Sequence, residues 1–591
     1  MKASDFVALY LEARGVTHSF ELVGGMITHL LDSLSRTQIQ LISCHHEQGA
    51  GFAAEGMARV SGVPGIALAT SGPGATNLIT AIGSCYFDST PAIFITGQVN
   101  TYELRGNTGA RQLGFQETDI VAIATPICKS AVQVQHATDL PELLHQAFNQ
   151  ALDGRQGPCL VDIPMNVQAE TIEEALAFRY LKAARKAAEV TFTEIQDINS
   201  PSLKSKLCQL LKTLRQAQKP LLLMGGGCAA QRNRTASLKL ARQLDIPVVL
   251  SLMGVDLLPT SDTQRVGFIG SYGNRWANKL LGAADVLVVI GSRLDIRQTG
   301  SDVASFCADK QIWQIEIDAA EIGLRVQPQE TLQADVIEVQ QALQQLLQDQ
   351  PDLSLPTGIH DSWYRQIIEL RLRYPAELEY QAKSNDINPI NALQQLSSRN
   401  QGQKIYVTDV GQHQMWAAQS LQFQSEDRWL TSGGMGAMGF GLPAAIGAAL
   451  ARPDLSTVLI SGDGSFQLNL QELETVRRNN LNLKILLFNN HCHGMVRQFQ
   501  ESYFKDNLQS TVKGYSAPNF TDLAQAYGIK AWSASDQASA NIAIEQWIET
   551  DGPTLLELHL SQASKVYPKL AFGRRFGEME PDITPIAMES T

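Results

Sequence analysis

The sequence of 591 residues lacks the marks of three common protein classes. Its eight cysteines form no Cys-x-x-Cys pair, so we expect neither a disulfide framework nor a zinc site, and we expect a reducing, cytoplasmic location. No apolar run is long enough to span a bilayer, and charges such as Lys2 and Asp5 interrupt any signal-peptide core, so no membrane role is expected. Lys and Arg number 47 against 59 Asp and Glu, and this net charge of −12 argues against nucleic-acid binding.

The remaining composition, 44% hydrophobic and 18% charged, is typical of a soluble globular protein. A chain of this length is too long to fold around a single hydrophobic core, so several domains are expected. Strand-like apolar runs alternate with helical spacing along most of the sequence, a pattern that predicts parallel α/β sheets. We predict domains at residues 1–185, 200–350 and 375–560, followed by a C-terminal tail at residues 561–591.

A strand–helix–strand unit in the last of these domains gives the strongest local signal. Residues 458–461 and 483–488 are predicted strands, and residues 470–478 have the spacing of a helix. Asp463 follows the first strand and Asn490 follows the second. Ligands of open parallel sheets collect at the carboxyl ends of the strands, and a carboxylate with an amide oxygen there suits Mg²⁺. Taken separately, each motif could also be a plain turn or loop.

Glu47 lies between a predicted strand at residues 40–43 and a predicted helix. The helix dipole alone favours a carboxylate at a helix start, so a purely structural role is one interpretation. The functional alternative is a buried acid that shares a proton with a nitrogen atom of a ligand.

The run from Gly434 to Gly439 matches Gly-x-Gly-x-x-Gly, the dinucleotide-binding pattern. We do not expect a dinucleotide site at this run. Residues 429–433 do not form a convincing strand pattern, and the acidic residue about twenty positions further on, Asp454, lies in a predicted turn.

Together these motifs resemble the acetolactate synthase (acetohydroxyacid synthase)-like family of thiamine diphosphate enzymes. The resemblance extends from about residue 4 to 560 and implies an α/β fold of three doubly wound parallel-sheet domains: pyrimidine-binding, central and diphosphate/Mg-binding. It also implies thiamine diphosphate and Mg²⁺ as cofactors, and a homodimer or homotetramer whose active sites lie between subunits. Besides Gly462–Gly464 and Asn489–Asn490, the matching segments are residues 46–48, 70–77, 96–99, 115–117, 157–164, 411–416 and 432–447.

The resemblance assigns a role to each matching residue. Asp463 and Asn490 would bind Mg²⁺ by their side chains and Cys492 by its main-chain carbonyl. Glu47 would hydrogen-bond the aminopyrimidine ring and so promote removal of the thiazolium C2 proton. The other cofactor-binding candidates are Gly411, Gln412, His413, Gly436, Met438, Gly464, Ser465, Gly494 and Met495. Those facing the substrate are Gly25, Phe115 and Gln116 of a second subunit, which would lie at the reacting carbon, and Val496 and Phe499 in the substrate pocket.

A third cofactor, FAD, is suggested by partial matches in the central domain. The matching residues are Gly225, Gly226, Gly227, Arg293 and Arg297, whose backbone amides and basic side chains could hold a pyrophosphate. The alternative is a glycine-rich turn next to an exposed basic pair.

Two departures from the family concern the acceptor substrate. Phe499 stands where biosynthetic members have tryptophan, and Met165 stands where they have lysine. With a smaller pocket wall and one fewer cation in the channel, we predict that the enzyme does not strongly prefer 2-oxobutyrate over pyruvate as acceptor. We also predict that its natural acceptor is a bulkier carbonyl compound. Alternatively, neighbouring residues rebuild the wall and acetolactate remains the product.

The resemblance implies a carboligase that decarboxylates a 2-oxo acid, with pyruvate as the expected donor, and transfers the acyl carbanion to an acceptor carbonyl. One alternative is a thiamine diphosphate-dependent decarboxylase, or a lyase acting on a sugar or CoA substrate. Another is a non-catalytic relative that only binds the cofactor. Glu47 argues against the latter, because a protein that only binds the cofactor needs no ring-protonating acid.

Overall fold

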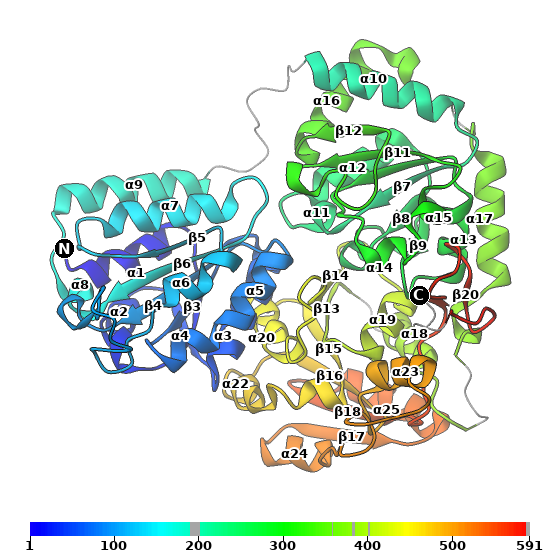
Figure 1. Ribbon diagram of the computed structural model, residues 1–591. Helices are drawn as coiled ribbons and strands as arrows, with labels where there is room; N and C mark the ends of the chain where they lie inside the picture. The colour runs from blue at the N-terminus through cyan, green and yellow to red at the C-terminus, as the bar shows by residue number, and fades with distance from the viewer. Residues whose placement is uncertain (190–200, 357, 381–384, 400–401, 587–591) are drawn as a thin grey trace.

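The computed structural model describes residues 1–189, 201–356, 358–380, 385–399 and 402–586. Three six-stranded parallel sheets follow one another along the chain, each flanked by helices (Figure 1). The predicted α/β fold with parallel sheets is therefore confirmed.

The first sheet has the strand order β2-β1-β3-β4-β6-β5. Its central strands are fully buried on both faces, which explains why they are continuous apolar runs in the sequence. The strands are β1 (His18–Leu22), β2 (Gln40–Ser43), β3 (Gly65–Ala69), β4 (Ala92–Gln98), β5 (Ser130–Gln133) and β6 (Pro158–Pro164). The helices are α1 (Ala3–Ala13), α2 (Thr28–Leu34), α3 (Glu47–Ser61), α4 (Pro73–Asn77), α5 (Ile79–Phe87), α6 (Ile120–Ala124), α7 (Leu140–Leu152), α8 (Met165–Ala169) and α9 (Glu174–Glu189).

The middle sheet has the order β9-β8-β7-β10-β11-β12. Numbered within the domain, this order is 3-2-1-4-5-6, the arrangement that binds dinucleotides where the strand order reverses. Its strands are β7 (Pro220–Met224), β8 (Val248–Leu250), β9 (Arg265–Phe268), β10 (Val286–Ile290), β11 (Gln311–Glu316) and β12 (Glu330–Gln333). Its helices are α10 (Pro201–Gln216), α11 (Gly226–Ala229), α12 (Arg234–Leu244), α13 (Arg275–Ala283), α14 (Ile296–Thr299), α15 (Val303–Cys307), α16 (Val336–Asp349) and α17 (Asp361–Arg373).

The last sheet repeats the order of the first, as β14-β13-β15-β16-β18-β17. Its strands are β13 (Lys404–Thr408), β14 (Arg428–Thr431), β15 (Ser456–Gly462), β16 (Leu483–Asn489), β17 (Lys530–Ala534) and β18 (Thr554–His559). Its helices are α18 (Pro389–Arg399), α19 (Gln412–Ser420), α20 (Gly441–Ala451), α21 (Asp463–Phe466), α22 (Leu473–Arg478), α23 (Gly494–Tyr503), α24 (Phe520–Ala526) and α25 (Gln537–Glu549). The strand–helix–strand unit predicted around Asp463 is confirmed as β15, α22 and β16.

One interpretation of this region was wrong. Residues 429–433 were not expected to include a strand, but Trp429 belongs to β14. The strand is short and lies at the sheet edge, so it needs no long apolar run. The sequence alone therefore gave no strand signal.

The first and last sheets are joined by the packing of α3 against α20 (Figure 1). A side chain on Gly56 would overlap the backbone of Ala444, and one on Gly447 would overlap the backbone of Ala53. The rings of Phe52 and Phe440 meet edge to face at 5.5 Å. The two helices thus touch at backbone distance, which allows little relative movement.

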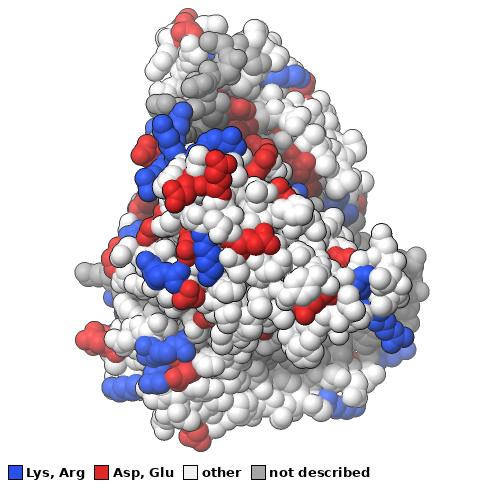
Figure 2. All heavy atoms as spheres, turned by 90° about the vertical axis from the view of Figure 1, so that its left-hand side faces the viewer, with Lys and Arg blue, Asp and Glu red and all other residues white. Residues whose placement is uncertain are grey.

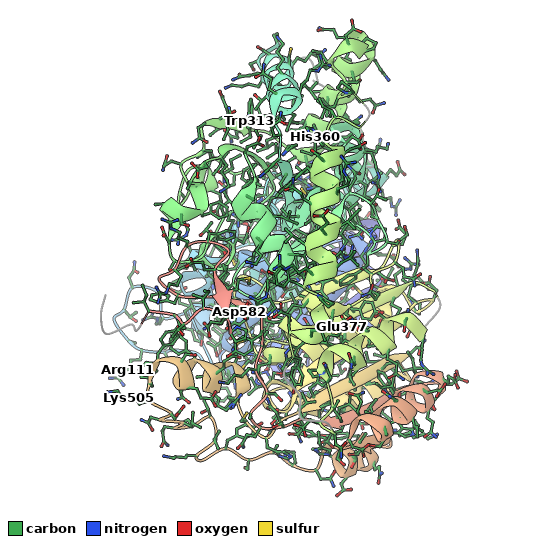
Figure 3. The ribbon with its side chains drawn as sticks, turned by 90° about the vertical axis from the view of Figure 1, so that its right-hand side faces the viewer. Arg111, Trp313, His360, Glu377, Lys505 and Asp582 are labelled. Carbon is green, nitrogen blue, oxygen red and sulfur yellow. The ribbon has the colours of Figure 1, made fainter. Side chains whose placement is uncertain are left out.

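The tail, described to residue 586, folds back over the middle domain. Its strands β19 (Lys569–Leu570) and β20 (Met579–Glu580) pair antiparallel. The Leu570 amide donates to the Ser271 carbonyl at 2.8 Å. Asp582, which is labelled in Figure 3, pairs with Arg275 at 3.1 Å. The tail is therefore fixed to the body of the protein.

Charge is mixed on the surface that carries the N-terminal domain. On the face in Figure 2, lysine and arginine are interspersed with aspartate and glutamate. Among the described residues, no helix has both the length and the apolar character needed to cross a membrane.

Candidate functional site

The carboxyl ends of β13, β15 and β16 form the first half of the site. The strand order reverses between β13 and β15, where ligands of doubly wound sheets bind. Asp463 follows β15 and is only 2% exposed, and Asn490 follows β16. Burial raises the pKa of Asp463 to about 6, although the Tyr515 hydroxyl, which donates to its Oδ2 at 2.7 Å, opposes that rise. A cation at this carboxylate would compensate the charge that burial leaves without water.

Asn490 and Gln412 lock the neighbouring loops together. Asn490 Nδ2 donates to Gln412 Oε1 at 2.9 Å, and Gln412 Nε2 donates to the Ser564 carbonyl at 2.9 Å. Because the side-chain amino group of Asn490 already donates a hydrogen bond to Gln412, the side-chain carbonyl oxygen of Asn490 is the atom available to a cation.

Glycines let the backbone come close to any ligand bound here. A Cβ at Gly464 would lie 2.6 Å from His493 Nδ1, and one at Gly462 would lie 2.7 Å from His413 Nδ1. A side chain on Gly494 would overlap Gln412. Larger residues are thus excluded, and glycines without side chains let backbone amides approach an anion closely.

His413 contributes an unused polar atom. Its Nε2 is buried and has no hydrogen-bond partner among the described residues. Burial lowers the pKa of His413 to about 3, so the ring is neutral at physiological pH. A buried polar atom without a partner is costly, which points to a ligand that would satisfy it.

The loop that contains Gly436 and Met438 is anchored at both ends. Asp88 accepts hydrogen bonds from the amides of Gly433 and Gly434, at 3.0 and 2.6 Å. Asp409 accepts from the Gly439 amide at 2.9 Å and from that of Gly441 at 3.0 Å. Gly436 has φ +65°, a conformation that favours glycine. These contacts fix the loop that carries two of the cofactor-binding candidates.

Glu47 begins α3 and is 7% exposed. Asn77 Nδ2 donates to Glu47 Oε2 at 2.9 Å, and a Cβ at Gly74 would lie 3.3 Å from the other carboxylate oxygen. The adjacent Gln48 accepts from Asn469 Nδ2 at 3.1 Å, and the same amino group donates to the Gly439 carbonyl at 2.8 Å. One bridging side chain therefore connects the helix of Glu47 with the glycine loop.

Three candidates near Glu47 lie on one rim of the first sheet. A side chain on Gly24, next to Gly25, would overlap Thr70. Gln116 has φ +66°, and its Cβ would lie 2.9 Å from one on Gly72. Phe115 is 78% exposed. The structure thus gathers them around the turn at residues 70–77.

The remaining candidates flank the metal-binding half. The Cys492 thiol donates to the Gln562 carbonyl at 3.7 Å, which leaves the Cys492 main-chain carbonyl as its available ligand. Ser465 Oγ lies 3.3 Å from the Gly462 carbonyl. In the described parts of the chain, no group of three His, Cys, Asp or Glu side chains could hold a metal. An ion at Asp463 would need amide, main-chain and ligand oxygens, as Mg²⁺ accepts.

Sequence reasoning missed several residues that position the site. Tyr515 is separated from Asp463 by 52 positions, so no local pattern could indicate their hydrogen bond. Asp88 lies 346 positions from Gly434, and Asp409 and Asn469 each lie 30 positions from Gly439. All of them act across sheet ends that only the fold brings together.

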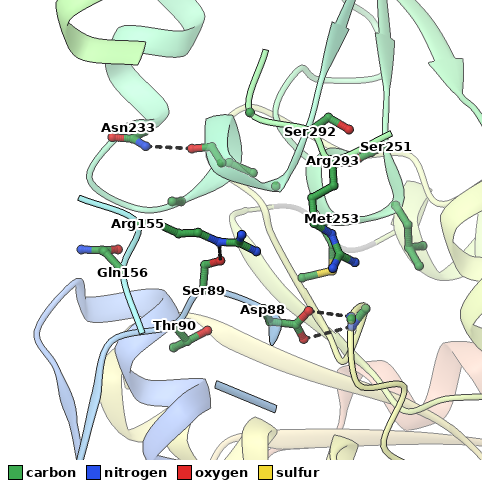
Figure 4. Close-up of a pocket in the computed structure, with 18 of the residues that line it drawn as sticks. Asp88, Ser89, Thr90, Arg155, Gln156, Asn233, Ser251, Met253, Ser292 and Arg293 are labelled. Carbon is green, nitrogen blue, oxygen red and sulfur yellow. Dashed lines mark hydrogen bonds between the residues drawn. The ribbon is translucent and has the colours of Figure 1, made fainter. Parts of the chain in front are cut away.

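A cavity of about 260 Å³ lies where the strand order of the middle sheet reverses. Gly226, Gly227 and Arg297 line it, and Arg155 and Arg293 reach into it from different sides (Figure 4). Gly225 is packed too closely against Gly291 for any side chain. The cavity also reaches Asp88 and the first glycines of the anchored loop.

A second cavity, of about 240 Å³, lies next to α23 and the tail. Phe499 lines it and contacts the Tyr503 ring at a centroid distance of 4.9 Å. Val496, one turn earlier, is 52% exposed, and Met495 packs partly buried against the core of the last sheet.

Comparison with known proteins gives consistent results along the whole chain. Three family models match: "Thiamine pyrophosphate enzyme, N-terminal TPP binding domain" at residues 1–123, the corresponding "central domain" at 207–346, and the "C-terminal TPP binding domain" at 409–558. The chain is 36% identical over 579 residues to "Acetolactate synthase isozyme 1 large subunit" of Escherichia coli (strain K12), covering 98% of this chain and 97% of that protein.

The sequence is also similar to those of plant acetolactate synthases. Identity is 35% over 594 residues to "Acetolactate synthase 2, chloroplastic" of Nicotiana tabacum, covering 98% of this chain and 85% of the relative. It is 36% over 589 residues to "Acetolactate synthase, chloroplastic" of Arabidopsis thaliana, covering 98% and 84%. These matches confirm the resemblance read from the motifs: the chain belongs to the acetolactate synthase family of thiamine pyrophosphate enzymes.

Proposed function

We propose that this protein is a thiamine diphosphate-dependent carboligase that decarboxylates pyruvate and joins the acyl group to an acceptor carbonyl compound. The observation that carries the proposal is the bridge from Gln48 through Asn469 to Gly439, because it brings the helix of Glu47 to the loop of Gly436 and Met438. The full-length likeness to acetolactate synthases supports the same reaction class.

In this proposal residues 1–185 form the pyrimidine-binding domain and residues 375–560 the diphosphate-binding domain. His413 Nε2, which has no hydrogen-bond partner in the described part of the chain, and the closely packed glycines around it fit an anionic, hydrogen-bonding cofactor. Asp463 and Asn490 would hold Mg²⁺ by their side chains, with the Cys492 carbonyl. The diphosphate would meet Gly411, Gln412, His413, Gly464, Ser465 and Gly494.

Glu47 would hold a proton at the pyrimidine ring, while the Gly436 carbonyl would accept from the ring amino group and Met438 would support the bend of the cofactor. Once bound, thiamine diphosphate supplies the carbanion chemistry, and the protein supplies orientation and charge. Gly25, Phe115 and Gln116 of a second subunit would face the reacting carbon. Pyruvate consumption that is the same with and without added thiamine diphosphate and Mg²⁺, after chelation and dialysis, would overturn the proposal.

We also propose a homo-oligomer, a dimer or a tetramer. Val23, Leu113 and Phe115 are exposed apolar side chains close to the candidate residues Gly25 and Gln116, and clustered apolar exposure is typical of an interface. A light-scattering mass equal to a single chain would contradict it. All eight cysteines are free thiols, which suits the cytoplasm that we propose as the location.

FAD is proposed as a further ligand, in the cavity of the middle domain. The dinucleotide-binding strand order, the glycines at residues 225–227 and the side chains of Arg293 and Arg297 support it. We expect the purified protein to be yellow, or to take up FAD on titration with quenching of flavin fluorescence. Arg293→Ala should weaken uptake, since the guanidinium is a candidate for the pyrophosphate. A colourless protein that binds no FAD would leave only a glycine-rich turn beside a basic pair.

The acceptor preference should be weak between small 2-oxo acids. The Phe499 ring gives the pocket a smaller apolar surface than an indole would. One methylene in an apolar pocket contributes only about 1–3 kcal/mol to the discrimination between substrates. With pyruvate and 2-oxobutyrate at equal concentration, we therefore expect no strong excess of acetohydroxybutyrate. A mixture dominated by acetohydroxybutyrate would show that neighbouring residues restore the selective wall.

A further inference from the structure

The cavity beside Phe499 is built by three separate parts of the chain. The middle domain contributes residues 296–302, α23 contributes Phe499 and Tyr503, and the tail contributes residues 569–576. Aromatic rings of Phe499, Tyr503 and Phe572 form much of its wall. Walls of this kind have a low dielectric constant and focus the field of charges around them.

The tail segment of this cavity is held firmly. The amide of Gly573 donates to Ser301 Oγ at 3.1 Å, and that of Phe576 donates to Ser305 Oγ at 2.8 Å. These bonds enclose Arg574 and Arg575 on both sides. The two arginines therefore project from a fixed turn, which preorganises them for a ligand.

Positive charge dominates the lining. Among the described residues, its cations are Lys569, Arg297, Arg574 and Arg575, and its one carboxylate is Asp302. Asp302 caps α15 by accepting from the Ser305 amide at 2.9 Å. The cavity thus carries an excess of cations over anions.

The partners of these cations leave most of the charge uncompensated. Lys569 pairs with Glu580 at 2.9 Å, whereas Arg574 Nε donates to the neutral Thr584 carbonyl at 3.0 Å. The nearby Glu578 accepts from the Arg575 main-chain amide. For the guanidinium groups of Arg297 and Arg575, no ion pair is found within the described residues.

The cavity lies next to the thiamine-binding half of the site. Phe499 is on α23, which begins at Gly494, and Gly494 packs so closely on Gln412 that no side chain fits. A ligand in the cavity would therefore lie beside the substrate pocket predicted from Val496 and Phe499.

Resting on the carboligase function proposed above, we propose that the acceptor carries a second anionic group besides the carboxylate of a 2-oxo acid, and that Arg574 and Arg575 bind this group. A 2-oxo monocarboxylate would neutralise one cation and leave the tail pair without a counterion. A 2-oxo dicarboxylate would neutralise that cation with one carboxylate and provide a counterion for Arg574 and Arg575 with the other. The tail thereby replaces the cation that Met165 fails to provide, and it directs selection toward acidic acceptors.

The test compares 2-oxoglutarate with 2-oxobutyrate as acceptors, with pyruvate as donor. For the wild-type enzyme we expect kcat/KM to favour 2-oxoglutarate, more strongly at about 0.01 M than at about 1 M salt, where the Debye length is only about 3 Å. Arg574→Ala/Arg575→Ala should lower kcat/KM for 2-oxoglutarate about five- to tenfold, the size expected for two partly exposed ion pairs. The value for 2-oxobutyrate should stay within about twofold.

A matched control removes two arginines from the exposed side of α17, as Arg365→Ala/Arg373→Ala, and should leave both acceptors unchanged. Arg574→Lys/Arg575→Lys should restore most of the preference, which a purely structural role would not do. Equal kcat/KM for both acceptors in the wild type, or equal losses for both in the alanine variant, would overturn the inference.

Calorimetry separates this inference from the carboligase function itself. Titration of 2-oxoglutarate into the protein loaded with thiamine diphosphate and Mg²⁺ should show binding that the alanine variant weakens. Absence of any carboligation product with pyruvate would contradict the proposed function, whereas the calorimetric difference would still support the anion site. No binding, or binding without incorporation into product by an active enzyme, would contradict the acceptor assignment.

Discussion

Asp463→Ala should abolish the binding of Mg²⁺ and, with it, of thiamine diphosphate. Asp463 is the only candidate ligand with a formal charge, because Asn490 and Cys492 offer neutral oxygens. Losing an outer-shell partner of a metal ligand already costs roughly 10–100-fold in affinity, so losing this carboxylate should cost more. The measurement is a titration of thiamine diphosphate, followed by quenching of tryptophan fluorescence in the presence of Mg²⁺.

The substitution should not unfold the protein. Burial raises the pKa of Asp463, so the folded state gains nothing from holding that carboxylate unbound, and only the hydrogen bond from Tyr515 is lost. That loss is worth about 1 kcal/mol. Asp454→Ala, which removes an exposed carboxylate paired with Arg452 at 2.6 Å, is the matched control. Unchanged cofactor affinity in Asp463→Ala would contradict the assignment of Asp463 as a Mg²⁺ ligand.

Glu47→Gln should leave the cofactor bound but slow the loss of its C2 proton by about 10²-fold or more, as expected when a positioned acid–base group is removed. An amide has the size of the carboxylate and can still meet Asn77, so the start of α3 should keep its structure. It cannot deliver a proton to the pyrimidine ring. Hydrogen–deuterium exchange at C2 of the bound cofactor, quenched in acid and read by NMR, measures the step directly.

The alternative interpretation of Glu47 is a helix-start carboxylate with no part in catalysis. Glu142→Gln provides the control, because Glu142 is also an acid in the first turn of a helix, α7, but is exposed. If exchange in Glu47→Gln proceeds at the wild-type rate, Glu47 has a structural role alone.

Those parts of the site that depend on short-range patterns were predictable. Asp463 and Asn490 each follow an apolar strand, and parallel strands bring their carboxyl ends to one edge. The same reasoning placed Glu47 at the start of a helix after β2. In each case the sequence within about ten residues determines where the side chain lies.

Contacts between distant segments were not predictable. Tyr515 reaches Asp463, and Asn469 bridges Gln48 to Gly439, only because the sheets are assembled. The edge strand β14 was not predicted, because a short edge strand needs few apolar residues. The tail gave no signal of its own, although Arg574 and Arg575 line a cavity next to Phe499.

The most direct test of the central claim is the stoichiometry of pyruvate consumption. Labelled with ¹³C and followed by NMR, pyruvate alone should yield acetolactate when thiamine diphosphate and Mg²⁺ are present, with one carbon dioxide released for every two pyruvates consumed. Acetaldehyde as the main product, with one carbon dioxide for each pyruvate, would show a simple decarboxylase. No consumption of pyruvate with either this donor alone or an added acceptor would contradict the carboligase function altogether.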